Sequence, residues 1–338
     1  MTRRGAALAW TALLLATACT ATDRTPPPSA TTRSPSAAPT DASSGPAPPS
    51  PDVTTGLVPA IMLSSTIRTP AGQIRTGISP AATFVQTQGG FVVQDAAGEV
   101  YLVGVAGRSL IGTADPADGL LLVTDATRRY VAWVGTSSVT VFDTRRERLV
   151  VDKEVPSIDR VVRTLALADD AFYYADGSDR VVRAPYDDRT PTTRVVAGAG
   201  LLAGVAEGYL ELVGPRGTRL VPLAGAGPER RLRRGARLSP SGRYAVSLRP
   251  RLSVRVAGTD RDVSPLVAPA PARQLVWFGP DRFTIELATV SLISPPDGDV
   301  WHLDVCRVST RRCMSALTGV TGTALSIPGT PIRSRYGR

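Results

Sequence analysis

The sequence predicts an all-β fold, a β-propeller, and two observations support this prediction. Glycine (31 residues) and proline (29 residues) are frequent in the 338-residue chain, which favours many short strands joined by turns over helices. Small or polar residues followed by an aromatic residue and an apolar run also recur about every 35 to 42 residues. A strand-built repeat of this period is typical of propeller blades. The aromatic positions of the repeat are Phe91, Tyr130, Phe172, Tyr209, Tyr244 and Phe283.

Residues 1–19 predict an export signal. Arg3 and Arg4 provide a positively charged start, residues 6–16 form an apolar run, and small residues precede Cys19. The run is too short to cross a bilayer permanently. We therefore expect cleavage before Cys19 and a mature protein outside the cytoplasm.

The end of this signal, Leu13-Leu-Leu-Ala-Thr-Ala-Cys19, resembles the lipobox of bacterial lipoproteins. The resemblance implies that Cys19 is acylated and holds the protein on the outer face of the cytoplasmic membrane. The sequence departs from the family at Ala16, where lipoboxes usually carry leucine. The alternative is ordinary cleavage, which leaves a secreted protein with an unmodified Cys19. The odd number of cysteines favours lipidation, because the other two form a close pair.

Residues 20–55 predict a disordered stalk rich in proline, threonine, serine and alanine. So little apolar side chain cannot offset the entropy cost of ordering the backbone. As a flexible coil the stalk would span roughly 30 to 35 Å, and in the extended polyproline form about 110 Å. Residues 56–338 then form the propeller domain.

Apolar alternation and turn signals divide the domain into six similar blocks of strands. The clearest block predicts four strands, at residues 120–124, 130–134, 138–143 and 148–152. The other blocks cover residues 83–113, 161–197, 200–235, 236–268 and 272–317.

Two apolar pieces are left over at the ends of the domain. Residues 61–69 and 73–78 predict two strands, and residues 321–327 and 332–335 follow the last block. Joining both ends in one blade would protect the open edges of the ring. We therefore predict seven blades, the seventh shared by residues 60–79 and 320–335, with a six-bladed ring as the alternative.

The turn Ser239-Pro-Ser-Gly-Arg-Tyr-Ala-Val246 resembles the S-P-D-G-R-Y motif of TolB-like and tryptophan-aspartate-repeat propellers, with Ser241 in place of the acid. Val139–Thr144 is similar to the third strand of their blades. The arrangement as a whole resembles propeller lipoproteins of high-GC Gram-positive bacteria. The resemblance implies a binding platform, although a shared fold does not define a function.

Cys306 and Cys313 are predicted to form a structural disulfide across a hairpin. In an exported protein such a pair is oxidised, and a zinc site would need about four ligands. The chain has one histidine, His302, and we expect it to be an ordinary strand residue. No G-x-S-x-G elbow is present to serve a Ser-His-Asp hydrolase. We therefore assign no catalytic, metal or cofactor residue.

The formal charge is +10, but only Lys153 is a lysine and asparagine is absent, as in high-GC genomes. Export removes nucleic acid as a partner. The dense basic run Glu229–Arg234 is interpreted as an exposed edge strand protected by charge, or as a contact with anionic lipid or wall polymer.

These observations predict a monomeric, lipid-anchored binding or scaffolding module of the cell envelope. We expect its partner to be another envelope protein or a wall polymer that meets the loops of the ring. The alternative is a secreted propeller enzyme, a hydrolase or lyase acting on carbohydrate.

Overall fold

The structure is a computed structural model of the chain. It describes residues 58–334 except 105, 116–121, 156–164, 177–179, 188, 198–200, 207, 215, 224–226, 234–235, 249–251, 260, 266–271, 278–281, 290–298, 323, 327 and 329–332. The described residues all belong to one compact unit, Pro49–Arg338. The predicted signal, Cys19 and the stalk over 20–55 lie outside them and stay predictions.

The described residues form β-strands and no helix, and each strand pairing is antiparallel. Sheet 1 contains β4 (Ala81–Thr87), β5 (Gly90–Asp95), β6 (Glu99–Gly104) and β7 (Gly107–Thr113). Sheet 2 contains β8 (Val123–Thr124), β9 (Tyr130–Val134), β10 (Ser138–Asp143) and β11 (Arg148–Glu154). Sheet 3 contains β12 (Leu165–Leu167), β13 (Ala171–Ala175), β14 (Arg180–Pro185) and β15 (Thr193–Ala197).

The second half of the domain continues the same order. Sheet 4 contains β16 (Leu201–Ala206), β17 (Tyr209–Gly214), β18 (Gly217–Pro222) and β19 (Arg230–Leu232). Sheet 5 contains β20 (Ala236–Leu238), β21 (Tyr244–Ser247) and β22 (Ser253–Val256). Sheet 6 contains β23 (Ala272–Trp277), β24 (Arg282–Thr289), β25 (Asp299–Arg307) and β26 (Arg312–Gly322). The end sheet contains β1 (Ile61–Leu63), β2 (Thr66–Thr69), β3 (Gly72–Arg75), β27 (Ala324–Ser326) and β28 (Arg333–Ser334).

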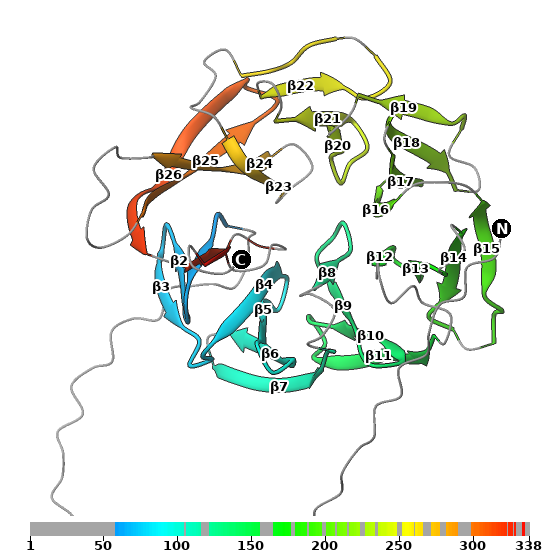
Figure 1. Ribbon diagram of the computed structural model, residues 1–338, viewed down its shortest axis with the longest axis horizontal. Coiled ribbons are helices and arrows are strands. Elements are labelled where there is room, and N and C mark those ends of the chain that lie inside the picture. Colours follow the sequence, from blue (N-terminus) through cyan, green and yellow to red (C-terminus); the bar gives the residue numbers. More distant parts are fainter. Residues whose placement is uncertain are drawn as a thin grey trace, which may run out of the picture. The chain divides into compact units, whose positions relative to one another are not determined.

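Within this unit the sheets follow one another around a common centre, and sheets 1 to 6 each begin with the strand nearest to it (Figure 1). The inner strands of neighbouring sheets touch: β4 contacts β8, β8 contacts β12, and β12 contacts β16. The predicted fold class, an all-β propeller, is confirmed.

The end sheet joins strands from both ends of the domain. In it β1 pairs with β27, with Met62 opposite Ser326 and Leu63 opposite Leu325. The prediction of two strands over 61–69 and 73–78 is wrong in detail, because Ser64 adopts a φ of 52° and turns the chain between β1 and β2. The described residues form seven sheets. The choice between seven blades and six stays a prediction.

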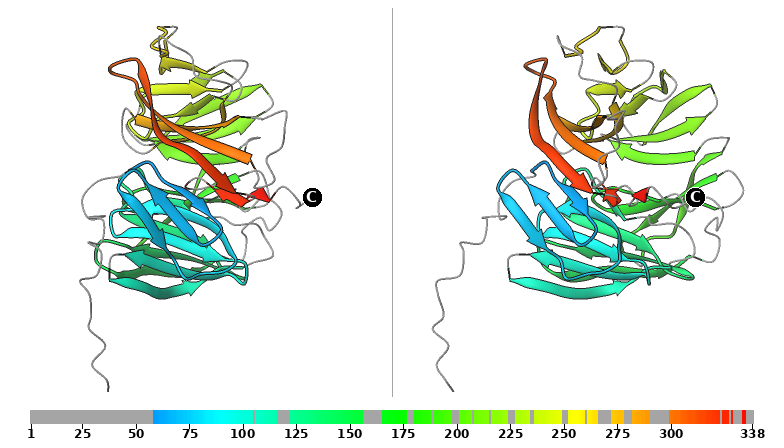
Figure 2. Two further views of the ribbon diagram at one scale, coloured as in Figure 1. Left: turned by 90° about the vertical axis from the view of Figure 1, so that its left-hand side faces the viewer. Right: turned by 60° about the vertical axis from the view of Figure 1, so that its left-hand side comes forward.

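Apolar side chains fill the space between consecutive sheets. One buried cluster joins each pair of neighbours, from the end sheet and sheet 1 round to sheet 5 and sheet 6. A further cluster that includes Ile61 and Leu303 joins sheet 6 to the end sheet, and Figure 2 shows these two sheets (orange-red and blue) next to each other. Each sheet is therefore covered on both faces, which is why every residue of β4 is buried.

The six repeat aromatics lie at the start of the second strand of sheets 1 to 6. Phe91 and Phe172 are fully buried, Tyr209 is buried, and Tyr130 and Tyr244 are half-buried. Of Phe283, only its place in the backbone of β24 is described.

The turn before Tyr244 shows how the repeat begins a strand. The backbone amide of Tyr244 donates to Oγ of Ser239 (3.1 Å), and the amide of Gly242 donates to the carbonyl of Ser239 (2.9 Å). Gly242 has a φ of 65°, a conformation that glycine adopts without steric cost. The motif therefore serves to start β21.

Candidate functional site

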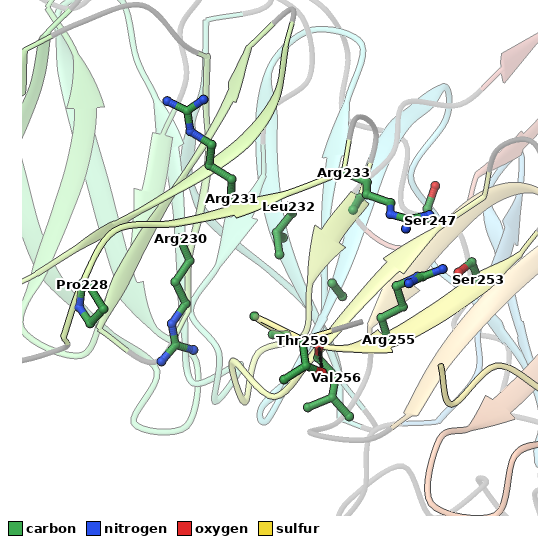
Figure 3. A pocket seen from close by; sticks show the side chains of 14 residues that line it. Pro228, Arg230, Arg231, Leu232, Arg233, Ser247, Ser253, Arg255, Val256 and Thr259 are labelled. Atoms are coloured by element: carbon green, nitrogen blue, oxygen red, sulfur yellow. Dashed lines mark hydrogen bonds between the residues drawn. The ribbon is translucent and has the colours of Figure 1, made fainter. Parts of the chain in front are cut away.

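A cleft of about 670 Å³ opens between sheet 4 and sheet 5 (Figure 3). We call it the arginine cleft. Four arginines and three hydroxyl side chains contribute to its lining, with no acidic residue among the described residues that line it. The charged and hydroxyl residues of the lining are Arg230, Arg231, Arg233, Arg255, Ser247, Ser253 and Thr259.

The cleft exists because one face of sheet 5 carries small side chains. Ser247 pairs with Ser253, and Ala245 pairs with Arg255, across β21 and β22. Alternate residues of a strand point to the same side, so these four share the face that lines the cleft. Three of the four, Ala245, Ser247 and Ser253, are too small to fill the gap to sheet 4.

The opposite face of sheet 5 is packed in the ordinary way. Val246 and Val254 are buried against Trp277 of sheet 6. Sheet 5 therefore has one well-packed face and one face that lines the cleft.

The other wall of the cleft is β19, the outer strand of sheet 4. Leu232 is buried in the cluster between the two sheets. The guanidinium of Arg230 lies over the ring of Tyr209, 5.2 Å from its centroid, a cation–π contact that holds the side chain in place. The basic run Glu229–Arg234 thus includes an edge strand, as predicted.

Glu229, the acidic residue directly before β19, is already paired. Glu229 accepts hydrogen bonds from Nε of Arg219 (3.0 Å) and from a terminal nitrogen of Arg219 (3.1 Å). These bonds, together with the charges of Arg219 and Arg231, hold the pKa of Glu229 below its usual value. Glu229 therefore stays ionised and bound to β18, where Arg219 lies.

Sheet 5 has no fourth strand among its described residues, and a short segment takes that place. The amide of Val256 donates to the carbonyl of Arg261 (3.0 Å), and the amide of Val263 donates to the carbonyl of Val254 (2.8 Å). Asp262 bridges to Arg255 along the backbone. Its pKa is lowered, first by hydrogen bonds from Ser264 and then by the charges of Arg255 and Arg311.

The other residues singled out in the sequence lie away from β19 in the chain. Cys306 and Cys313 form a disulfide between directly opposed positions of β25 and β26, with 3.9 Å between their Cα atoms. His302 and Asp304 are both half-buried in β25. Cys19 lies outside the described residues.

The sequence indicated only part of the arginine cleft. The run Glu229–Arg234 stood out by its charge density, but Arg255, Ser247 and Ser253 are scattered in a separate block. Only the packing of sheet 5 on sheet 4 brings them to one cavity. One signal was available. Ser253 and Arg255 place polar side chains on one face of a strand, whereas core strands carry apolar residues on both faces.

Across the described ranges no three His, Cys, Asp or Glu side chains gather as metal ligands would. That part of the chain also has no helix of the length and apolar character that a membrane crossing requires.

No protein family model matches the sequence, and no curated protein matches it. Solved structures with a similar fold include Hsv2 of Kluyveromyces lactis, with 13% identity, a TM-score of 0.44, and coverage of 73% of this chain and 91% of that one. The C-terminal WD40 domain of Sif2 has 10% identity, a TM-score of 0.46, and coverage of 82% and 92%. An oligogalacturonate lyase of Vibrio parahaemolyticus has 11% identity, a TM-score of 0.47, and coverage of 70% and 77%.

Such low identities bear on the fold alone, and no activity passes from these proteins to this chain. The order and pairing of its sheets make the chain a β-propeller. The chemistry of its candidate site is that of guanidinium and hydroxyl groups, which form charge-assisted hydrogen bonds with carboxylate and phosphate.

Proposed function

We propose that the protein is a lipid-anchored, extracytoplasmic β-propeller whose arginine cleft binds an anionic polymer of the cell wall. The observation that supports this most is the lining of the cleft, with four arginines and no acid among the described lining residues. Guanidinium forks match carboxylate and phosphate in geometry as well as in charge. The ligand is therefore an anion.

The directions of the arginines favour a polymer over a single small anion. Arg230 and Arg231 are neighbours in β19, so they point to opposite faces of the strand, and Figure 3 shows them pointing apart. Arg255 reaches the cleft from sheet 5. A ligand that contacts all three must pass over the edge of sheet 4 and carry several charges along its length.

The predicted stalk favours wall polymer over membrane lipid as the source of these charges. As a flexible coil, residues 20–55 would hold the propeller roughly 30 to 35 Å from the anchor at Cys19. The field of a charged membrane surface decays over about 8 Å at physiological salt. Lipid headgroups would thus be screened from the cleft, whereas a polymer that extends from the wall can enter it.

A binding measurement on the full mature chain tests the proposal. The probes are polyglycerol phosphate and polygalacturonate, with dextran as the neutral polymer, and the readout is titration calorimetry at low and physiological salt. The double variant Arg231→Gln/Arg255→Gln should weaken binding of the anionic polymers at least about tenfold, since each charged hydrogen bond lost costs on the order of 1.5 kcal/mol.

The matched control removes two exposed arginines from the end sheet, as Arg68→Gln/Arg75→Gln. This variant has the same net charge as the cleft variant, and we expect its affinity to stay within about twofold of the unmodified protein. Equal losses in both variants would show that only net charge matters and would refute the cleft as the site.

The anchor has a separate test. Radiolabelled palmitate should be incorporated into the wild-type protein and lost in Cys19→Ser. A wild-type protein without label would overturn the lipid anchor and leave the binding proposal for a secreted protein.

A further inference from the structure

A second cavity, of about 390 Å³, lies where the inner strands of the sheets meet, and we call it the axial cavity. Each of sheets 1 to 6 contributes at least one lining residue. Figure 1 places the inner strands β4, β8, β12, β16, β20 and β23 around the centre. Representative lining residues, one from each sheet in order, are Val85, Val123, Leu165, Leu202, Arg237 and Val276.

Eight of the eleven lining residues have apolar side chains, polar atoms make up about half of the exposed lining, and the cations in it are Arg128 and Arg237. A cavity of a few hundred Å³ that combines apolar side chains with a few fixed polar groups can hold a small molecule. The two cations lie on different sheets, because Arg128 belongs to the turn before β9 and Arg237 to β20.

Arg128 is buried, with 8% of its surface exposed. Its guanidinium donates to the carbonyl of Gln86 in β4 (3.3 Å) and to the carbonyl of Trp277 in β23. A guanidinium has five N–H donors, and these bonds occupy two of them. The partners that the described residues supply are neutral carbonyls, so the charge of Arg128 is only partly compensated.

The acid nearest in sequence to Arg128 is engaged elsewhere. Asp125 accepts from the amides of Thr127 (2.9 Å) and Tyr130 (2.7 Å), which organise the turn. Burial lowers the pKa of Arg128 to about 10, and the charge of Asp125 opposes this shift. The side chain therefore remains a cation at neutral pH.

The backbone of Arg128 is also unusual. The turn from Asp125 to Tyr130 has the spacing of the turn from Ser239 to Tyr244, so Arg128 stands where Gly242 stands in sheet 5. Arg128 has a φ of 59°, which costs a non-glycine residue on the order of 1 kcal/mol. Sheet 2 thus places a buried cation, at a conformational cost, where the same turn in sheet 5 has glycine.

We propose that the axial cavity is a second binding site, for a small organic anion whose carboxylate or phosphate lies between Arg128 and Arg237 and whose apolar body contacts Leu165, Leu202 and Val276. Arg128 and Arg237 are the cations that can donate to the anionic group, and the apolar side chains of the lining can contact its apolar body. This site is independent of the arginine cleft, which is lined by a different set of residues.

Titration calorimetry on the full mature chain tests the site with three probes of one shape: benzoate, phenyl phosphate and benzyl alcohol. We expect at least one anion to bind at least tenfold more tightly than the alcohol, and the stronger of the two identifies the charged group. No binding of either anion, or equal binding of the alcohol, would overturn the proposal.

Three variants separate binding from folding. Arg128→Gly removes the cation and supplies the residue that a φ of 59° favours, and it should reduce anion affinity at least tenfold. Arg237→Gln changes an exposed side chain and should do the same, so it decides the outcome if Arg128→Gly does not fold. Arg68→Gln, at an exposed position of the end sheet, is the control and should leave benzoate affinity unchanged.

Wild-type affinity in a folded Arg237→Gln or Arg128→Gly variant would contradict the site. Because polymer binding is measured with other variants, failure here leaves the arginine cleft unaffected, and failure there leaves the axial cavity unaffected.

Discussion

Glu211 is a buried acid that should make the stability of the propeller fall as the pH rises. It lies in β17 with 6% of its surface exposed, opposite Gly204 and Leu220. Burial raises the pKa of Glu211 from 4.5 to about 6. The charge of Arg237 and a 3.3 Å hydrogen bond from the amide of Leu238 oppose this shift without cancelling it.

The sign follows from proton binding in the two states. Between pH 4.5 and 6 the folded protein retains a proton on Glu211 that the unfolded chain has released, so the free energy of unfolding falls as the pH rises through this window. Each pH unit of the window is worth about 1.4 kcal/mol, which gives a loss of about 2 kcal/mol, complete above pH 6. Below pH 4.5 both states hold the proton and the penalty disappears.

The variant Glu211→Gln isolates this effect, because glutamine keeps an oxygen that can accept from Leu238 but does not ionise. Urea unfolding followed by circular dichroism gives the free energy of unfolding for both proteins from pH 4 to pH 7.5. We expect the variant to gain stability relative to the wild type by about 2 kcal/mol as the pH rises from 4 to 7. Parallel curves for the two proteins would refute the reasoning, whatever their absolute stabilities.

Two further predictions concern the framework. Replacing both Cys306 and Cys313 by serine opens a closed loop whose cysteines are 7 residues apart. The free energy of unfolding should fall by about 2.5 kcal/mol, and the unfolding temperature in non-reducing calorimetry should fall with it. An unchanged unfolding temperature would argue against any stabilising role of the disulfide. A Cβ at Gly89 would lie 2.1 Å from the carbonyl oxygen of Thr144, so Gly89→Ala should lose about 2 to 3 kcal/mol in urea unfolding. At Gly104 the nearest atom is 3.8 Å away, and an equal loss in Gly104→Ala would show that contact with Thr144 is not the cause.

Much of the fold could be predicted because each blade repeats one local sequence pattern. An aromatic residue after a polar turn marked the second strand of sheets 1 to 6, and the turn at Ser239 and Gly242 has the hydrogen bonds and φ that its residues predict. The division of residues 61–69 into β1 and β2 was missed. It depends on a positive φ at Ser64, and serine carries no strong signal for that conformation.

The candidate sites were less visible, because tertiary packing assembles them. The run that contains Arg230 could be found by charge alone, whereas Arg255 needed the register of β21 and β22. Arg128 gave no signal, since one arginine in a turn is ordinary in sequence. Its burial depends on carbonyls of Gln86 and Trp277, which are 42 and 149 residues away in the chain.

The arginine cleft and Arg237 both lie where sheet 5 meets sheet 4, and packing explains why charge can be accommodated there. Among the described residues, the cluster that joins these sheets has seven buried members, three of them alanines, whereas the cluster between sheets 2 and 3 has twelve, two of them alanines. Apolar burial stabilises by about 25 cal/mol per Å², so the smaller cluster makes the first junction the weaker one. The same junction accommodates Glu211 as a buried acid. We infer that sheet 5 packs less tightly on sheet 4 and thereby leaves room for the arginine cleft along its outer strands and for the charged Arg237 at its inner strand.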